Sequence, residues 1–303
     1  MSSDGEPGAS RALPFFFALG IVWSTVGPLG RAAGNAGVPA LVFPFAQALG
    51  ASLTLGLIIL LTGKRMMWPP PMRLFLVSGL AGHALPQIVI FMVIQRLPIA
   101  VAGLVIALNP LITGAISALT GTQKLTGRKL AGLVLGLAGA ALAALPGIAL
   151  PSTAAAPWVG VAFLVPLLFG IANVYTARLR PAGTGAIPNA FGMMSVSALG
   201  LLVAVLATGT HYWPHWSAPT SGDFALLAHG LLAGLAFFLF FTVIETGGPI
   251  MVAAASYIIL ILSALWGWIF FAEAPGAGYF VAAALVMAGL WLTLSAPTRK
   301  DGA

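Results

Sequence analysis

The polar side chains of this sequence that could do chemistry are few, and they lie inside long apolar runs. His83 and His229 are the clearest, and Gln87, Asn109 and Asn173 have similar surroundings. Burying such groups without hydrogen bonds costs free energy, and imidazole can also titrate near neutral pH. Each of these five side chains therefore either lines a cavity that binds a polar solute or bonds to a neighbouring segment.

Two prolines adjoin these amides. Pro110 lacks an N–H group and would free the carbonyl of Ile106, and Pro86 would free that of Gly82. Irregular backbone inside a membrane is tolerated where it lines a cavity. We expect the freed carbonyls to bind a polar substrate group, with a bend filled by a neighbouring helix as the alternative.

Trp23 is the one tryptophan at the middle of an apolar run, and Ser24 follows it. An indole there supplies an aromatic face for an apolar substrate, and its N–H group needs a partner. The alternative is a ring that faces lipid. Asn173, Ser256 and Tyr257 are weaker polar candidates than Gln87 and Asn109. The predicted substrate-binding residues are thus Trp23, Ser24, His83, Gln87, Asn109, Asn173, His229, Ser256 and Tyr257, with Pro86 and Pro110 as backbone positions.

Enzyme motifs are lacking. The chain has no cysteine, and Pro214 breaks a helical metal pair between His211 and His215. No nucleotide-binding or zinc-protease motif occurs, so we predict no metal and no cofactor. An intramembrane serine hydrolase stays open as an alternative, with Ser24, Ser117 or Ser256 facing His83. A non-catalytic membrane partner protein and a channel are further alternatives.

The composition requires a membrane. Of 303 residues, 60% are hydrophobic and 6% are charged, against roughly 25% charged in soluble domains. Runs of about 20 apolar residues span a bilayer as helices. The sequence predicts an all-α integral membrane protein with ten transmembrane helices, at 13–32, 39–61, 73–95, 99–120, 127–148, 157–179, 187–208, 223–245, 249–272 and 276–296.

The basic residues set the orientation. With ten spans, only Arg31 and Arg96 fall on the side opposite the termini. The other eleven share the side of the termini: Arg11, Lys64, Arg65, Arg73, Lys124, Arg128, Lys129, Arg178, Arg180, Arg299 and Lys300. Positive charge favours the cytoplasm, so we predict cytoplasmic termini. The net charge of +7 lies in short loops and forms no basic face for nucleic acid.

The chain also looks doubled. Pro98 and Pro249 each open a span and are 151 residues apart. Gly139 and Gly289 are 150 residues apart, which is nearly the same offset. Five spans per half give two inverted five-helix repeats, a plan common in secondary transporters. The predicted organisation is a tail 1–12, a first repeat 13–148, a periplasmic linker 149–156, a second repeat 157–296 and a tail 297–303. Because we expect the glycines Gly132-x-x-x-Gly136 to pack helices within one chain, we expect a monomer.

Short motifs support a family resemblance. The runs Leu97-Pro98-Ile99-Ala100, Asn109-Pro110-Leu111 and Gly121-Thr122-Gln123-Lys124 resemble the EamA-type signature of the drug/metabolite transporter superfamily. The second half resembles it again, from Pro249 to Glu273, although Gln123 replaces the Glu usual at the first site. Trp23-Ser24-Thr25 and Ser256-Tyr257 resemble the aromatic amino-acid exporter branch.

The resemblance implies an exporter of amino acids or similar metabolites in the bacterial inner membrane. It also implies a central cavity lined by spans 1, 3, 4, 6, 8 and 9. The predicted partners are a small-molecule substrate and membrane lipid.

Overall fold

The computed structural model describes residues 7–121, 126–145, 150, 153–181, 185–210, 212–215 and 217–294. Its helices are α1 (Pro7–Ser24), α2 (Val26–Asn35), α3 (Val42–Thr62), α4 (Met72–Leu76), η1 (Val77–Ala84), α5 (Leu85–Ile94), α6 (Ile99–Ile106), α7 (Asn109–Leu119), α8 (Gly127–Ala143), η2 (Thr153–Ala155), α9 (Ala156–Ala162), α10 (Leu164–Leu179), α11 (Ala186–Thr208), α12 (Ser221–Phe271) and α13 (Ala277–Leu294). The described part of the chain is thus a helical bundle, as the composition predicts.

Nine segments of the described residues are long and apolar enough to cross a bilayer. They coincide with nine of the ten predicted spans. The remaining predicted span is α8, which has 17 residues. Its predicted end, 146–148, lies outside the described residues, as does the motif residue Gln123.

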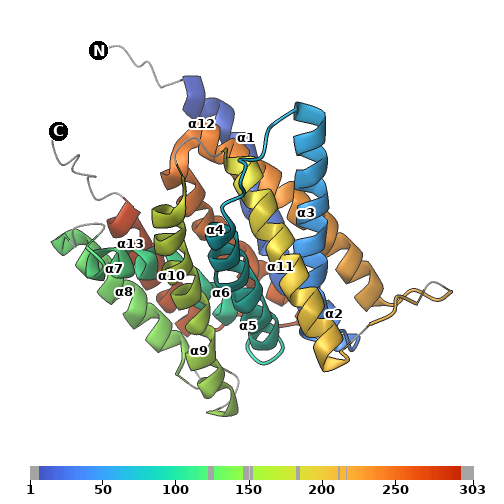
Figure 1. Ribbon diagram of the computed structural model, residues 1–303. Helices are drawn as coiled ribbons and strands as arrows, with labels where there is room; N and C mark the ends of the chain where they lie inside the picture. Colours follow the sequence, from blue (N-terminus) through green and yellow to red (C-terminus); the bar gives the residue numbers. More distant parts are fainter. Residues whose placement is uncertain are drawn as a thin grey trace, which may run out of the picture.

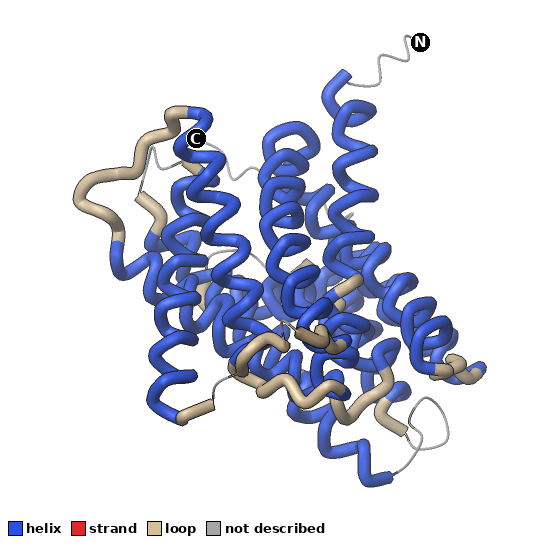
Figure 2. The backbone as a smooth tube through the Cα atoms, turned by 90° about the vertical axis from the view of Figure 1, so that its right-hand side faces the viewer, coloured by secondary structure: helices blue, strands red, loops and turns tan. Residues whose placement is uncertain are grey.

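The bundle has two distinct ends. Figures 1 and 2 show α1 beginning and α13 ending at the same end, which we call the terminal end. The opposite end, which we call the far end, carries the end of α2 and the turn between α5 and α6. The first and last described helices therefore meet the same end of the bundle, as an even number of crossings would require.

Three predicted spans are interrupted helices. The first span breaks at Thr25, between α1 and α2, and the fourth breaks at Ala107 and Leu108, between α6 and α7. Pro110 stands in the first turn of α7, where a missing N–H group costs little. In the third span a π-helical stretch, η1, precedes Pro86. Breaks and π-helical turns of this kind leave backbone groups available at functional sites.

The eighth and ninth predicted spans form one continuous helical segment, α12, of 51 residues. This segment doubles back. Phe240 packs on Trp23 with 5.5 Å between ring centroids, and Trp266 hydrogen-bonds to the next residue, Ser24. A straight helix would separate Phe240 and Trp266 by about 39 Å. The two spans are therefore distinct crossings, and Figure 1 shows the orange ribbon turning over near the terminal end.

Close backbone contact joins α8 to α13. A Cβ atom added at Gly132 would lie 2.6 Å from the carbonyl oxygen of Gly289, and one added at Gly139 would lie 2.7 Å from that of Ala282. Small residues allow helices in membranes to approach this closely. The glycine pattern of the fifth span therefore packs helices within one chain, as predicted.

Asp223 begins the eighth crossing as expected for an acid at a helix N-terminus. Its carboxylate accepts the N–H group of Thr220 at 2.7 Å, and the Thr220 hydroxyl accepts the N–H group of Asp223, which makes a capping box. Tyr212 donates its hydroxyl to the same carboxylate at 2.9 Å. Burial, followed by the neighbouring carboxylate, raises the pKa of Tyr212. This network anchors the loop before α12 at the far end.

Candidate functional site

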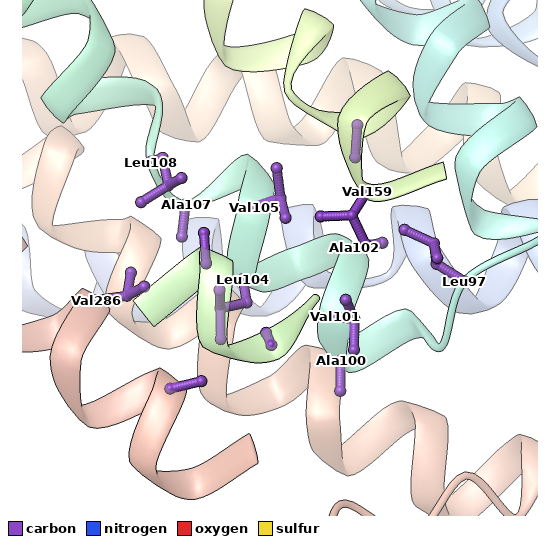
Figure 3. Close-up of a cluster of buried hydrophobic side chains, with 14 of the residues drawn as sticks. Leu97, Ala100, Val101, Ala102, Leu104, Val105, Ala107, Leu108, Val159 and Val286 are labelled. Carbon is purple, nitrogen blue, oxygen red and sulfur yellow. The ribbon is translucent and has the colours of Figure 1, made fainter. Parts of the chain in front are cut away.

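The fourth span is sealed over its far half. All seven residues of Ile99–Val105 are buried, so α6 is surrounded on every side. Figure 3 shows α6 side chains among Val159 of α9 and Val286 of α13. Tight apolar packing leaves no path for a polar solute at this level.

The terminal half of the same span is much more open. In α7 the buried residues are Leu111 and Ser117. A Cβ atom added at Gly114 would meet no atom within 4 Å. One crossing thus changes from enclosed to open at the break beside Asn109.

Two predicted site residues, Asn109 and Asn173, are linked through Thr113 at this break. Thr113 donates its hydroxyl to the carboxamide oxygen of Asn109 at 3.2 Å, and the amide nitrogen of Asn173 lies 3.4 Å from the same hydroxyl. Asn109 and Thr113 belong to α7, and Asn173 belongs to α10. The close contact of these helices is set by Gly170, where a Cβ atom would lie 2.8 Å from Ile116.

The direction of Asn173 is informative. The side chains of α10 that face outward are large, apolar and exposed, among them Leu164, Leu167, Ile171 and Tyr175. Asn173 lies on the opposite face, because two residues turn a helix by about 200°. Its side chain is nevertheless exposed. An exposed residue on an inward face lines an opening in the bundle rather than lipid.

Tyr257 lies against the same central core. Its side chain, like those of Ile106 and Phe169, packs against the buried cluster around α6. The hydroxyl oxygen is buried and has no hydrogen-bond partner among the described residues. A buried phenol without a partner is a group available to a ligand or a water molecule.

Trp23 and Ser24, at the end of α1, contact the two arms of α12. The Trp23 ring is half-buried and packs on Phe240. Ser24 donates to the carbonyl of Ile21 and accepts the indole N–H of Trp266 at 2.8 Å. The indole of Trp266 is thereby bonded to Ser24 inside the helix packing.

The two intramembrane histidines lie on another side of the bundle. The Nδ1 atom of His83 is 2.8 Å from the hydroxyl oxygen of Ser197 in α11. His229 stacks on Phe43, with 3.9 Å between ring centroids. Both rings are buried, at 4% and 2% exposure, and their Nε2 atoms have no partner among the described residues. The structure does not join either ring to the Asn109–Asn173 group by a hydrogen bond.

Three further predicted positions make no polar contact with other described residues that would define a role. Gln87 and Ser256 are half-buried, and Pro86 is buried at the start of α5. Thr113 and Ser197, which were not singled out from the sequence, supply the bonding partners of predicted residues. Because hydroxyl side chains are common in transmembrane helices, the sequence alone did not distinguish Thr113 or Ser197 from other threonines and serines.

Sequence reasoning also missed an ion pair at the far end. From the sequence, Arg31 was used only to set the orientation and Glu273 only as a motif residue, but their side chains meet at 2.7 Å. The sequence did hold a signal for this pair, because the two residues have opposite charges and lie at the same end of the predicted bundle.

The arrangement excludes the serine-hydrolase alternative. The serine bonded to His83 is Ser197, rather than Ser24, Ser117 or Ser256. Ser197 is fully buried, so a scissile bond could not reach its hydroxyl. Ser24 is bonded to Trp266 instead.

Comparisons agree with this architecture. Residues 10–145 match the sequence pattern of the EamA-like transporter family. A crystal structure described only as that of a protein has the same fold, with a TM-score of 0.64 and 22% identity over 94% of this chain and 98% of the other. No curated protein matches the sequence.

The family match and the helical bundle together define the class of protein. It is a multi-pass membrane transporter of small molecules and not an enzyme. The EamA-type resemblance seen in the first half of the sequence is thereby confirmed.

Proposed function

We propose that this transporter exports neutral amino acids, including aromatic or other apolar ones, and similar small metabolites. It would act as a secondary transporter or facilitator in the bacterial inner membrane. The observation that carries the proposal is the open, uncharged polar group at Asn109, Thr113 and Asn173, next to a sealed far half.

The chemistry of this group suits a zwitterion. Carboxamides and hydroxyls offer both donors and acceptors without a fixed charge. They can bind an ammonium and a carboxylate group together at low desolvation cost. Tyr257 and Phe169 pack nearby against the α6 cluster and supply aromatic surface for an apolar side chain.

The same asymmetry supports transport by alternating access. The pathway is enclosed around Ile99–Val105 and open around Asn173. We infer two five-helix repeats of opposite orientation that rock about this level. Because basic residues crowd the terminal end, we place that end in the cytoplasm.

Transport by purified protein in liposomes tests the proposal. Radiolabelled phenylalanine, leucine and alanine should exchange across the membrane without ATP. Asn173→Ala should slow exchange several-fold, because each hydrogen bond is worth about 0.5–1.5 kcal/mol. Leu167→Ala, on the outward face of the same helix, should leave exchange unchanged.

The same assay separates the remaining alternatives. A non-catalytic partner protein would pass none of the three solutes. A channel would conduct without saturating as substrate concentration rises. Equal effects of Asn173→Ala and Leu167→Ala would show that Asn173 does not face the pathway.

A further inference from the structure

One ion pair ties together three segments at the far end of the bundle. Arg31 lies in the last half of α2, and Glu273 follows the end of α12 by two residues. The Nη1 atom of Arg31 is 2.7 Å from Oε1 of Glu273, and the side chains are only 16% and 19% exposed. Partial burial strengthens such a pair because water screens it less.

Both members of the pair also bind the backbone of the turn between α5 and α6. The Arg31 guanidinium donates through Nε to the carbonyl of Ile94 and through Nη2 to that of Leu97. Oε2 of Glu273 accepts the N–H group of Ile99 at 2.7 Å. A carboxylate at this position stabilises the N-terminus of α6. The first span, the hairpin between the third and fourth spans, and the loop after the ninth span are thus held by two side chains.

A pocket of about 520 Å³ lies against this pair at the far end. Its lining includes Arg31, Glu273, Gln95 and Arg96, together with Ala100 and Val101 of α6. Water that enters the pocket would hydrate both charges once they separate. The pair is therefore a closure that can open, unlike the apolar packing around Val105.

We propose that Arg31 and Glu273 form the far-end gate of the transport pathway. The inference rests on the proposed transport function and adds the residues that control release. With the pair intact, α2, the α5–α6 turn and the loop after α12 stay together, and the pathway opens only to the terminal end. Separation of the pair frees these segments to part, so that the solute leaves through the pocket.

A single cysteine can report this opening, because the chain has none. Val105→Cys places a thiol in the sealed half of α6, one turn beyond the pocket residue Val101. An impermeant maleimide added outside intact cells should label it slowly. Arg31→Gln or Glu273→Gln should raise the labelling rate about tenfold, as expected when a minor open state becomes well populated.

The matched control is Arg96→Gln. Arg96 lines the same pocket but stacks on Trp158, at 5.5 Å from the ring centroid, so its loss should leave labelling unchanged. The double variant Arg31→Gln/Glu273→Gln removes both charges and avoids leaving one buried alone. It should label as fast as the faster single variant.

Two outcomes would overturn the gate. Unchanged labelling in the double variant would show that the pair does not limit access. Equal acceleration by Arg96→Gln would assign the effect to the pocket in general. Fast labelling of the pair variants without exchange of any amino acid would instead retain the gate and overturn the proposed substrates. Amino-acid exchange with unchanged labelling of the pair variants would retain the proposed substrates and overturn the gate.

Discussion

His83 and Ser197 form a buried hydrogen bond between the third and seventh spans, with 2.8 Å between Nδ1 and Oγ. The third span is locally π-helical at this point, and His83 lies within that stretch. Gly79, one turn earlier, lets the helices touch, because a Cβ atom there would lie 2.6 Å from the carbonyl oxygen of Met193. The bond therefore connects an irregular segment of η1 to the regular helix α11.

Loss of this bond should destabilise the protein. Ser197→Ala leaves the Nδ1 atom of His83 buried without a partner, at a cost of about 1–3 kcal/mol. Thermal unfolding in detergent should show a lower Tm. In the background His83→Phe, the same substitution should cost much less, because the bond is already absent. Equal losses in both backgrounds would mean that the bond contributes nothing.

The contact of α8 with α13 predicts a steric effect. Gly289→Ala adds a Cβ atom 2.5 Å from the carbonyl oxygen of Gly132, a backbone atom that cannot rotate away. Overpacking of this kind costs about 1–3 kcal/mol, so the Tm should fall. Gly114→Ala is the control, since its Cβ atom meets nothing within 4 Å. A Tm that is unchanged in Gly289→Ala would contradict the close approach of the two helices.

Trp23 should influence substrate preference. Trp23→Ala removes an aromatic surface that is half-buried beside Phe240. Stacking is worth about 0.5–1.5 kcal/mol, which corresponds to a several-fold preference. Exchange of phenylalanine should therefore fall more than exchange of alanine. Trp291→Ala is the control, because Trp291 is exposed and lies under Arg128. Unaltered preference in a folded Trp23→Ala protein would place this ring outside the pathway.

Topology can be tested by single-cysteine labelling from outside the cell. Ala154→Cys, before α9, and Thr220→Cys, at the start of α12, should react with an impermeant maleimide. Thr126→Cys, at the start of α8, should react only after the membrane is permeabilised. Reaction of all three without permeabilisation would contradict the predicted orientation.

Much of the fold was predictable from residue type and order. A bilayer admits only segments whose backbone groups are bonded internally, so long apolar runs must be helices. Pro98 indicated where a helix begins, and α6 begins at the next residue. Pro110 was expected to free a carbonyl inside one continuous span, whereas a separate helix, α7, begins beside it. The glycines of the fifth span were expected to pack helices within one chain, because only small residues permit such close backbone contact. That the contact of Gly132 is with Gly289 is shown only by the tertiary structure.

The site depended on tertiary structure. Sequence reasoning recognised Asn109, Asn173 and His83 as unusual in apolar surroundings, but it could not show which of them meet. Helix rotation and packing decide that, and they bring Asn173 to Asn109 through Thr113 and turn His83 towards Ser197. The pairing of Arg31 with Glu273 joins residues 242 positions apart. Such a contact is a property of how whole spans pack, because no local pattern in either segment specifies the rotation or depth of the other.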